Sequence, residues 1–360
     1  MNLFSEEVVA IDGSKFKAVN NRDKNFTSAK MQRRLQQVEE SIERYLSQLD
    51  TADRQQPEAA SPKVARLQER IATLKKQMEQ FKELEARMLQ SPDKQISLTD
   101  PDARSMIARD TGIVGYNVQT AVDAKHHLIV AHEVTNVGSD RGQLANMAQQ
   151  ARDAMGAEAL TAIADRGYFK GDEILACDKS GITTFVPKPL TSNSKADGRF
   201  DRRDFIYVAE DDEYRCPAGQ RLVKHFTTVE HGMTLHCYWC SVCPACPLKA
   251  QCTTGKERRV KRWEHEAVLE KMQERLDRNP TTMRVRRRTV EHPFGTIKSW
   301  MGATHFLTKR LNRVSTEMSL HVLAYNLKRV MKLLGVGALV EAIRHLVRTL
   351  NAQTPAMAVA

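Results

Sequence analysis

The sequence lacks the features of membrane and secreted proteins. None of its apolar runs approaches the roughly 20 residues that a transmembrane helix needs. The first residues, MNLFSEEVVAIDG, do not show the basic-then-apolar order of a signal peptide. We therefore expect a cytoplasmic protein without a membrane partner. In that reducing compartment, the 7 cysteines are expected to be thiols or metal ligands and not disulfides.

Acidic residues are almost absent from one segment, 281–313. It holds eight Lys or Arg residues and a single acid, Glu291, in a chain whose net charge is +11. A local positive excess of this kind attracts a polyanion such as nucleic acid. A lone carboxylate inside it can hold a divalent cation against that polyanion. The alternative is an ordinary basic helix in which Glu291 forms an ion pair with Arg287 or Arg288.

Two short apolar runs end in an aspartate. Residues 8–12 end in Asp12, with Gly13 and Ser14 following as turn residues, and residues 159–165 end in Asp165. Both patterns predict buried strands that deliver an acid to the edge of a sheet. Taken singly, each aspartate is better explained as a turn or helix-cap residue.

If those strands are neighbours, their carboxylates converge, and Glu291 can approach from a later helix. Three carboxylates suit Mg²⁺, which prefers oxygen ligands. Two such ions can activate a water or a 3′-OH and stabilise the leaving oxygen of a phosphodiester. Pro293 adds a constraint, because it should kink a continuous helix near residue 289 or start a new one close to Glu291.

The remaining segments predict further helices and strands. Heptad spacing over 35–49 and 64–81 predicts two helices of about 20–25 residues in an antiparallel coiled-coil hairpin. That hairpin is either an arm that contacts DNA or a second subunit, or a solvated insertion that pairs only with itself. Ser139 and Asp140 are predicted to cap a helix. The expected strands are 113–122, 127–134 and 182–187, and the expected helices are 141–155, 171–180, 264–278, 316–334 and 338–350.

Residues 190–262 are polar, rich in cysteine and poor in long periodic segments. The spacing Cys-x2-Cys recurs from Cys237 to Cys246, and such spacing lets two thiolates bind one tetrahedral Zn²⁺. A zinc ion would explain how this segment folds. Reduced, packed cysteines without a metal are the alternative. The isolated Cys177 is expected to be a core thiol.

Three motifs together resemble the catalytic blocks of DDE transposases from bacterial insertion sequences. The nearest group is the branch of the insertion-sequence-four-like superfamily that carries a cysteine-rich insertion, and the resemblance covers about residues 6–335. The wider superfamily has a tyrosine where this chain has Arg284. The motifs are Asp12-Gly13-Ser14-Lys15, Asp165-Arg166-Gly167-Tyr168 and Arg287-x3-Glu291-x6-Lys298.

The resemblance implies an α/β, RNase H-like fold, a mixed sheet with helices on both faces. It implies that Asp12, Asp165 and Glu291 bind two Mg²⁺. The implied zinc ligands are Cys216, Cys243, Cys246 and Cys252, with Cys237 and Cys240 as alternates. The implied DNA contacts are Arg287 and Lys298, to which we add Arg284, Arg288 and Lys188 as candidates.

These expectations divide the chain into five parts. Residues 1–27 and 91–189 form the first part of the catalytic core, 28–90 the helical hairpin and 190–262 the cysteine-rich insertion. Residues 263–335 complete the core with the glutamate-bearing helix, and 336–360 form a C-terminal helix and tail.

The expected function is Mg²⁺-dependent cleavage at insertion-sequence ends and strand transfer to target DNA, by a homo-oligomer associated with a bacterial nucleoid. Family members usually carry a helical N-terminal domain, so we expect either a truncated copy or a missing half that is encoded separately. The alternatives are an RNase H-like nuclease or resolvase without strand transfer, and an inactive DNA-binding remnant.

Overall fold

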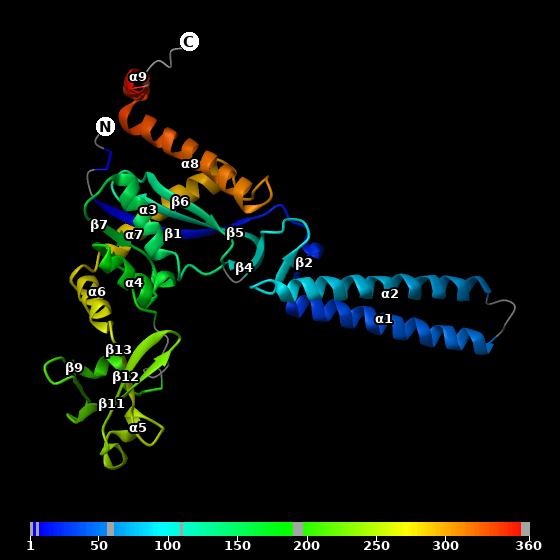
Figure 1. Ribbon diagram of the computed structural model, residues 1–360, viewed down its shortest axis with the longest axis horizontal. Coiled ribbons are helices and arrows are strands. Elements are labelled where there is room, and N and C mark those ends of the chain that lie inside the picture. Colours follow the sequence, from blue (N-terminus) through cyan, green and yellow to red (C-terminus); the bar gives the residue numbers. More distant parts are fainter. Residues whose placement is uncertain (1–2, 5–6, 56–60, 109–110, 190–196, 354–360) are drawn as a thin grey trace, which may run out of the picture.

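The computed structural model describes residues 3–4, 7–55, 61–108, 111–189 and 197–353 (Figure 1). A six-stranded mixed sheet lies at its centre, in the order β4-β5-β1-β7-β8, with β6 also paired to β5. Strands β4, β6 and β1 run antiparallel to β5, whereas β1, β7 and β8 run parallel to one another. The strands are β1 (Val8–Lys17), β4 (Arg104–Ala108), β5 (Thr111–Asp123), β6 (Ile129–Thr135), β7 (Leu160–Ile163) and β8 (Ile182–Phe185).

Strand β1 is the central strand, and it is longer than the sequence predicted. Val9, Ala10 and Ile11 are fully buried, as expected for a strand covered on both faces. The predicted turn at Gly13 and Ser14 is wrong. Strand β1 runs on to Lys17 because β5 pairs with it continuously from Val9 to Lys17.

Helices cover both faces of this sheet (Figure 1). On one face lie α3 (Leu144–Met155), α4 (Gly171–Lys179) and α6 (Glu266–Arg278). On the other lie α7 (Thr282–Gly295), the π-helical turn η5 (Thr296–Trp300) and α8 (Leu311–Leu334), which α9 (Val336–Gln353) follows. The first core includes Val9, Ile11, Leu144, Met147, Ile174 and Leu269, and the second includes Phe16, Tyr116, Phe294, Ile297, Val322 and Tyr325.

Successive residues of β1 therefore face opposite layers, because side chains alternate along a strand. Val9 and Ile11 pack in the first core, whereas Phe16 packs in the second. By the same alternation Asp12 faces the layer of α7 and α8, and Gly13 and Lys15 face the layer of α3 and α4. This alternation decides which groups can reach the candidate site from each side.

A pair of long helices projects from the sheet (Figure 1). Helices α1 (Ser28–Gln55) and α2 (Ser61–Gln90) exceed the predicted lengths, and their contact buries Val38, Ile42 and Ile71. The two-stranded sheet of β2 (Asn25–Thr27) and β3 (Gln95–Ser97) lies at their base, beside the short η1 (Arg22–Lys24). The helices are longer than the heptad seams because Gln, Glu, Arg and Lys continue a helix well past its apolar contacts.

The cysteine-rich segment contains a second sheet, which the sequence did not predict. Its five antiparallel strands have the order β13-β12-β11-β10-β9. Most of β11 is exposed on both faces, so the alternation that would have indicated a strand is weak. The elements are β9 (Ile206–Val208), β10 (Glu213–Arg215), β11 (Arg221–Glu230), β12 (Met233–Trp239) and β13 (Val260–Trp263), with η3 (Arg202–Asp204), η4 (Cys243–Ala245) and α5 (Lys249–Cys252).

Two local predictions need correction. Asp140 does not cap α3, which begins at Leu144 with Gln143 at its N-cap and no side-chain cap. A helix that starts close to Glu291 is also wrong, because α7 begins at Thr282 and runs through Pro293 to Gly295. Proline has no N–H group to donate to the carbonyl of Thr289 four residues earlier, so the helix continues without that hydrogen bond.

Within the described residues, no helix combines the length and apolarity needed to cross a membrane.

Candidate metal centre

Asp12 and Asp165 come from neighbouring parallel strands. Ala10 of β1 is in register with Ile163 of β7, and each aspartate lies two residues further along the chain, Asp12 within β1 and Asp165 just after β7. Asp165 also begins the 3-10 turn η2 (Arg166–Tyr168), where its side chain accepts a hydrogen bond of 2.7 Å from the backbone N of Gly167. The pairing of two buried strands therefore brings the two predicted carboxylates together.

The guanidinium of Arg286 lies between these carboxylates. Its Nη2 is 2.6 Å from Oδ1 of Asp12 and 3.3 Å from Oδ2 of Asp165. The Arg286 side chain is only 12% exposed. A single cationic nitrogen thus joins two acids that are far apart in the sequence.

Arg286 was not predicted as a site residue, although the sequence contained a signal for it. It shares the spacing i, i+3, i+4, i+7 with Thr289, Val290 and Pro293, which are all buried. Residues at that spacing lie on one face of a helix. Arg286 therefore points toward the sheet, whereas its arginine neighbours point to solvent.

Burial raises the pKa of Asp12 to about 6. The charge of Arg286 lowers the pKa, but the charges of Asp165 and Asp140 raise it further. Because desolvation of the charged form is the largest cause, the site stabilises an ionised Asp12 only when a positive group is close. This electrostatic demand is met here by Arg286.

Glu291 lies elsewhere on α7. It is exposed, and it follows Arg286 by five residues, which is about 140° around the helix axis. Among the described residues, no group of three or more His, Cys, Asp or Glu side chains is placed to hold a metal ion. The structure thus brings Asp12 and Asp165 together without Glu291, and the three-carboxylate site stays a prediction.

The five predicted DNA contacts differ in their surroundings. Arg284, Arg287 and Arg288 are exposed on α7. Lys188 is exposed after β8 and lies 3.6 Å from a carboxylate oxygen of Glu266. Their exposure leaves these four side chains accessible to a polyanion.

Lys298 is held against the sheet. Its Nζ donates to Oγ of Ser14 at 2.6 Å and to the backbone O of Lys15 at 2.9 Å, and it lies 4.3 Å from the ring centroid of Phe16. These contacts fix η5 to β1 close to Asp12.

Five cysteines line one pocket in the second sheet. They are Cys216, Cys240, Cys243, Cys246 and Cys252. The Sγ atoms of Cys240 and Cys243 are 3.4 Å apart, and the backbone N of Gln220 donates to Sγ of Cys216 at 3.3 Å. The pocket therefore contains the four predicted ligands together with one predicted alternate, Cys240.

The other cysteines lie outside this pocket. Cys237 is buried on β12, opposite Phe226 and Lys261. Cys177 is buried in the first core, where desolvation raises the pKa of its thiol to about 12.

Replacing Asp12 with Asn should change how stability depends on pH. The native pKa of Asp12, about 6, exceeds the ordinary value of 3.8. The native state therefore binds this proton more tightly than the unfolded state does. The contribution to the free energy of unfolding is full below pH 4 and is lost as the pH rises through about 6. Between pH 4 and pH 7, the free energy of unfolding of Asp12→Asn should therefore rise by about 1–3 kcal/mol relative to that of wild type.

Urea unfolding at pH 4, 5, 6 and 7 measures this difference. Asp50→Asn, at an exposed position of α1, is the control and should follow wild type at every pH. Parallel pH profiles for Asp12→Asn and wild type would contradict the buried position of Asp12.

Comparisons with known proteins find a similarity over part of the chain. Residues 215–331 match a family model described as Transposase DDE domain. No curated protein matches the sequence. A solved structure of the piggyBac transposase synaptic complex with hairpin DNA is 6% identical, with a TM-score of 0.28, over 63% of this chain. The chain spans 42% of that protein, and a likeness this low carries no argument.

The family match covers α7, with Arg286 and Glu291, but neither Asp12 nor Asp165. It therefore supports a transposase of the DDE type, from a part of the chain that is independent of the two aspartates.

Proposed function

We propose that the chain is the catalytic part of a DDE transposase, with an RNase H-like fold, that cleaves and joins DNA with Mg²⁺. The observation that carries the proposal is the contact of Asp12 and Asp165 with one cationic group of α7. The match of residues 215–331 to a transposase DDE domain supports it independently.

The topology of the central sheet supports the same proposal. Strands β6, β5 and β1 form an antiparallel set, and β7 and β8 continue it in parallel with β1. Helices α3 and α4 connect β6 to β7 and β7 to β8. This arrangement agrees with the mixed sheet that an RNase H-like resemblance implies, and it places one acid on β1 and another just after β7.

The chemistry of the site fits a divalent cation. Asp12 and Asp165 offer the carboxylate oxygens that Mg²⁺ prefers, and a positive group already lies between them in the form of Arg286. When bound, Mg²⁺ would activate the attacking hydroxyl and stabilise the leaving oxygen. Asp12 must be ionised to bind it, which the raised pKa of its carboxyl opposes below about pH 6.

Arg286 is suited to leave the carboxylates when a metal ion binds. Both of its contacts to the acids use the same Nη2, and its buried Nε has no hydrogen-bond partner among the described residues. A guanidinium with unmatched donors is held less firmly than one in a bidentate pair. Arg286 would then be free to bind a phosphate of the DNA.

Glu291 would join the site through a rearrangement of the end of α7. Pro293 and the π-helical turn η5 both interrupt the regular helical hydrogen bonds beyond it. Such interruptions are where helices bend, and π-turns are frequent at functional sites. Contacts of Arg284, Arg287 and Arg288 with phosphates would supply the binding energy for this change, without reading base sequence.

We also propose that the cysteine pocket holds a structural Zn²⁺. Its cysteines directly follow β10 and β12 or lie in and beside the short helices η4 and α5, and they line one pocket. The adjoining sheet has a small apolar core that includes Phe205, Tyr214 and Leu222. Burial and the neighbouring Cys243 raise the pKa of Cys240 to about 11, so this pocket would release protons on binding metal.

Purified protein should contain about one zinc per chain when measured by inductively coupled plasma mass spectrometry. Cys243→Ser should lose it, because a structural site needs four ligands. Cys237→Ala is the matched control on the same sheet and should keep it. A zinc-free wild-type protein that folds normally would refute the zinc proposal and leave the transposase proposal standing.

The catalytic proposal is tested by nicking and strand transfer on supercoiled plasmid DNA with Mg²⁺. Asp12→Asn, Asp165→Asn and Glu291→Gln should each reduce nicking by about 100-fold or more, because each removes a ligand charge. DNA affinity should stay equal or rise, since a negative charge is lost. Glu274→Gln, at an exposed position of α6, is the control and should nick like wild type.

The outcomes separate the candidate functions. Nicking without any joined product would favour an RNase H-like nuclease. Nicking that survives Glu291→Gln alone would remove Glu291 from the site, and nicking that survives all three substitutions would refute the proposal.

A further inference from the structure

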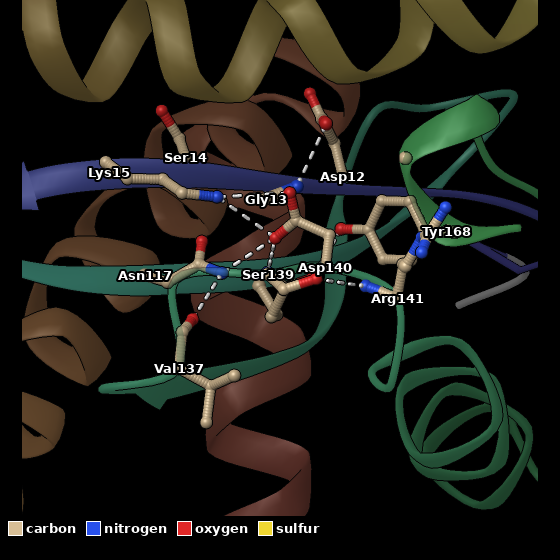
Figure 2. Close-up of polar contacts among 12 residues, drawn as sticks. Asp12, Gly13, Ser14, Lys15, Asn117, Val137, Ser139, Asp140, Arg141 and Tyr168 are labelled. Atoms are coloured by element: carbon tan, nitrogen blue, oxygen red, sulfur yellow. Dashed lines mark hydrogen bonds and ion pairs between the residues drawn. The ribbon is translucent and has the colours of Figure 1, made fainter. Parts of the chain in front are cut away.

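Asp140 lies beneath the two aspartates, on the opposite face of the sheet from Arg286. It belongs to the connection between β6 and α3, and its side chain is 23% exposed. Figure 2 shows Lys15 and Asn117 converging on its carboxylate beside Asp12. The sequence predicted only a helix cap here, and the proposed chemistry makes no use of this acid.

Three side chains from two strands donate to this carboxylate. Oδ1 accepts from Nδ2 of Asn117 at 2.7 Å, from Nε2 of Gln119 at 2.8 Å and from Nζ of Lys15 at 3.2 Å. Oδ2 accepts from the same Nζ at 3.0 Å. Asn117 and Gln119 are fully buried, so their donors depend on protein partners.

Gly13 makes the close approach of Asp140 to β1 geometrically feasible. A Cβ at this position would lie 2.6 Å from Oδ1 of Asp140 and 2.4 Å from Nε2 of Gln119. Any other residue would force these groups apart. Glycine at position 13, directly after Asp12, therefore leaves the space that the Asp140 carboxylate occupies.

The carboxylate also decides how the Gln119 amide is oriented. An ionised aspartate only accepts hydrogen bonds, so Gln119 must turn its NH₂ group toward Asp140 and its Oε1 the other way. That Oε1 accepts the hydroxyl hydrogen of Tyr168. Tyr168 is buried, and burial raises the pKa of its phenol, so the hydroxyl remains a neutral donor.

Tyr168 ends the 3-10 turn that Asp165 begins. The chain of contacts thus runs from Asp140 through Gln119 to the turn that carries Asp165. A second branch runs from Asp140 through Lys15 to the strand that carries Asp12. Both acids are connected to one carboxylate that touches neither of them.

We infer that Asp140 is a positioning residue, which holds Asp12 and Asp165 at the separation that a shared divalent cation requires. The role of the cation in this inference rests on the proposed function. The claim that Asp140 fixes the positions of Asp12 and Asp165 rests on the hydrogen bonds alone. The same residues could serve folding only, so the test needs a readout that a general loss of stability would not reproduce.

The chain offers a rescue design. In Asp140→Asn one of the two acceptor oxygens becomes an NH₂ donor and the negative charge is lost. Whichever way the new amide turns, its NH₂ group faces either Nζ of Lys15 or the NH₂ groups of Asn117 and Gln119, so the contacts that orient the glutamine amide are weakened. Adding Gln119→Glu restores an acceptor opposite the new donor, and its second oxygen can accept from Tyr168. The double variant also keeps one negative charge in the cluster, where Lys15 needs it.

Mn²⁺ binding to the full chain, followed by electron paramagnetic resonance, gives the first readout. Asp140→Asn should weaken binding by about 10-fold to 100-fold, the usual effect of changing a group that orients metal ligands. The double variant should recover most of it. Hydrogen exchange of the peptide containing Gly167 and Tyr168 gives the second readout. Its exchange rate should increase in the single variant and return to the wild-type rate in the double variant.

The two readouts separate the inference from the function it rests on. Unchanged exchange in Asp140→Asn, or no recovery in the double variant, would overturn the positioning role. If wild type and Asp12→Asn bind Mn²⁺ equally, the proposed metal site fails. If hydrogen exchange of the peptide with Gly167 and Tyr168 is nevertheless faster in Asp140→Asn and normal again in the double variant, Asp140 positions the turn of Asp165 even though no metal binds there.

Discussion

Two ionised carboxylates brought together by neighbouring parallel strands repel each other unless a positive group stands between them. In this protein that group is the guanidinium of Arg286, whose Nη2 contacts both Asp12 and Asp165. The contact joins β1, the end of β7 and α7 in one place. It also fixes which face of α7 lies on the sheet, and therefore which arginines remain in solvent.

The opposite face of the sheet provides the complementary constraint. Alternation along β1 sends Asp12 toward α7 and sends Gly13 and Lys15 toward Asp140. The acids are thus contacted by a cation from one layer and connected to a buried polar network in the other. Because the helices on both faces pack against β1, a displacement of either layer is expected to move Asp12 and Asp165.

The predictions that succeeded rest on short-range signals. A buried strand is an apolar run in the sequence whatever its neighbours are, so the strands leading to Asp12 and Asp165 were recognisable. The mixed sheet with helices on both faces was implied by the motif resemblance and not by these local patterns. The motif resemblance to transposases has support from the family match over residues 215–331. The roles of Glu291 and Lys298 have no such test.

The failures share a different physical origin. Asp140 and Gln119 contact partners more than 20 residues away, which no local pattern reveals. Arg286 also contacts distant acids, but its helical spacing with buried residues was a local signal that the prediction overlooked. Gly13 and Ser14 looked like a turn because the pairing of β5 with β1 is not visible in the sequence of β1. The sheet of β9 to β13 was missed because its longest strand, β11, is mostly exposed.

A crystal structure of the protein with Mn²⁺ and duplex DNA tests the central role of the two aspartates most directly. Anomalous scattering should place manganese within ligand distance of both Asp12 and Asp165, with Arg286 turned away from them toward a phosphate. Manganese bound elsewhere, with Arg286 still in contact with both carboxylates, would contradict it.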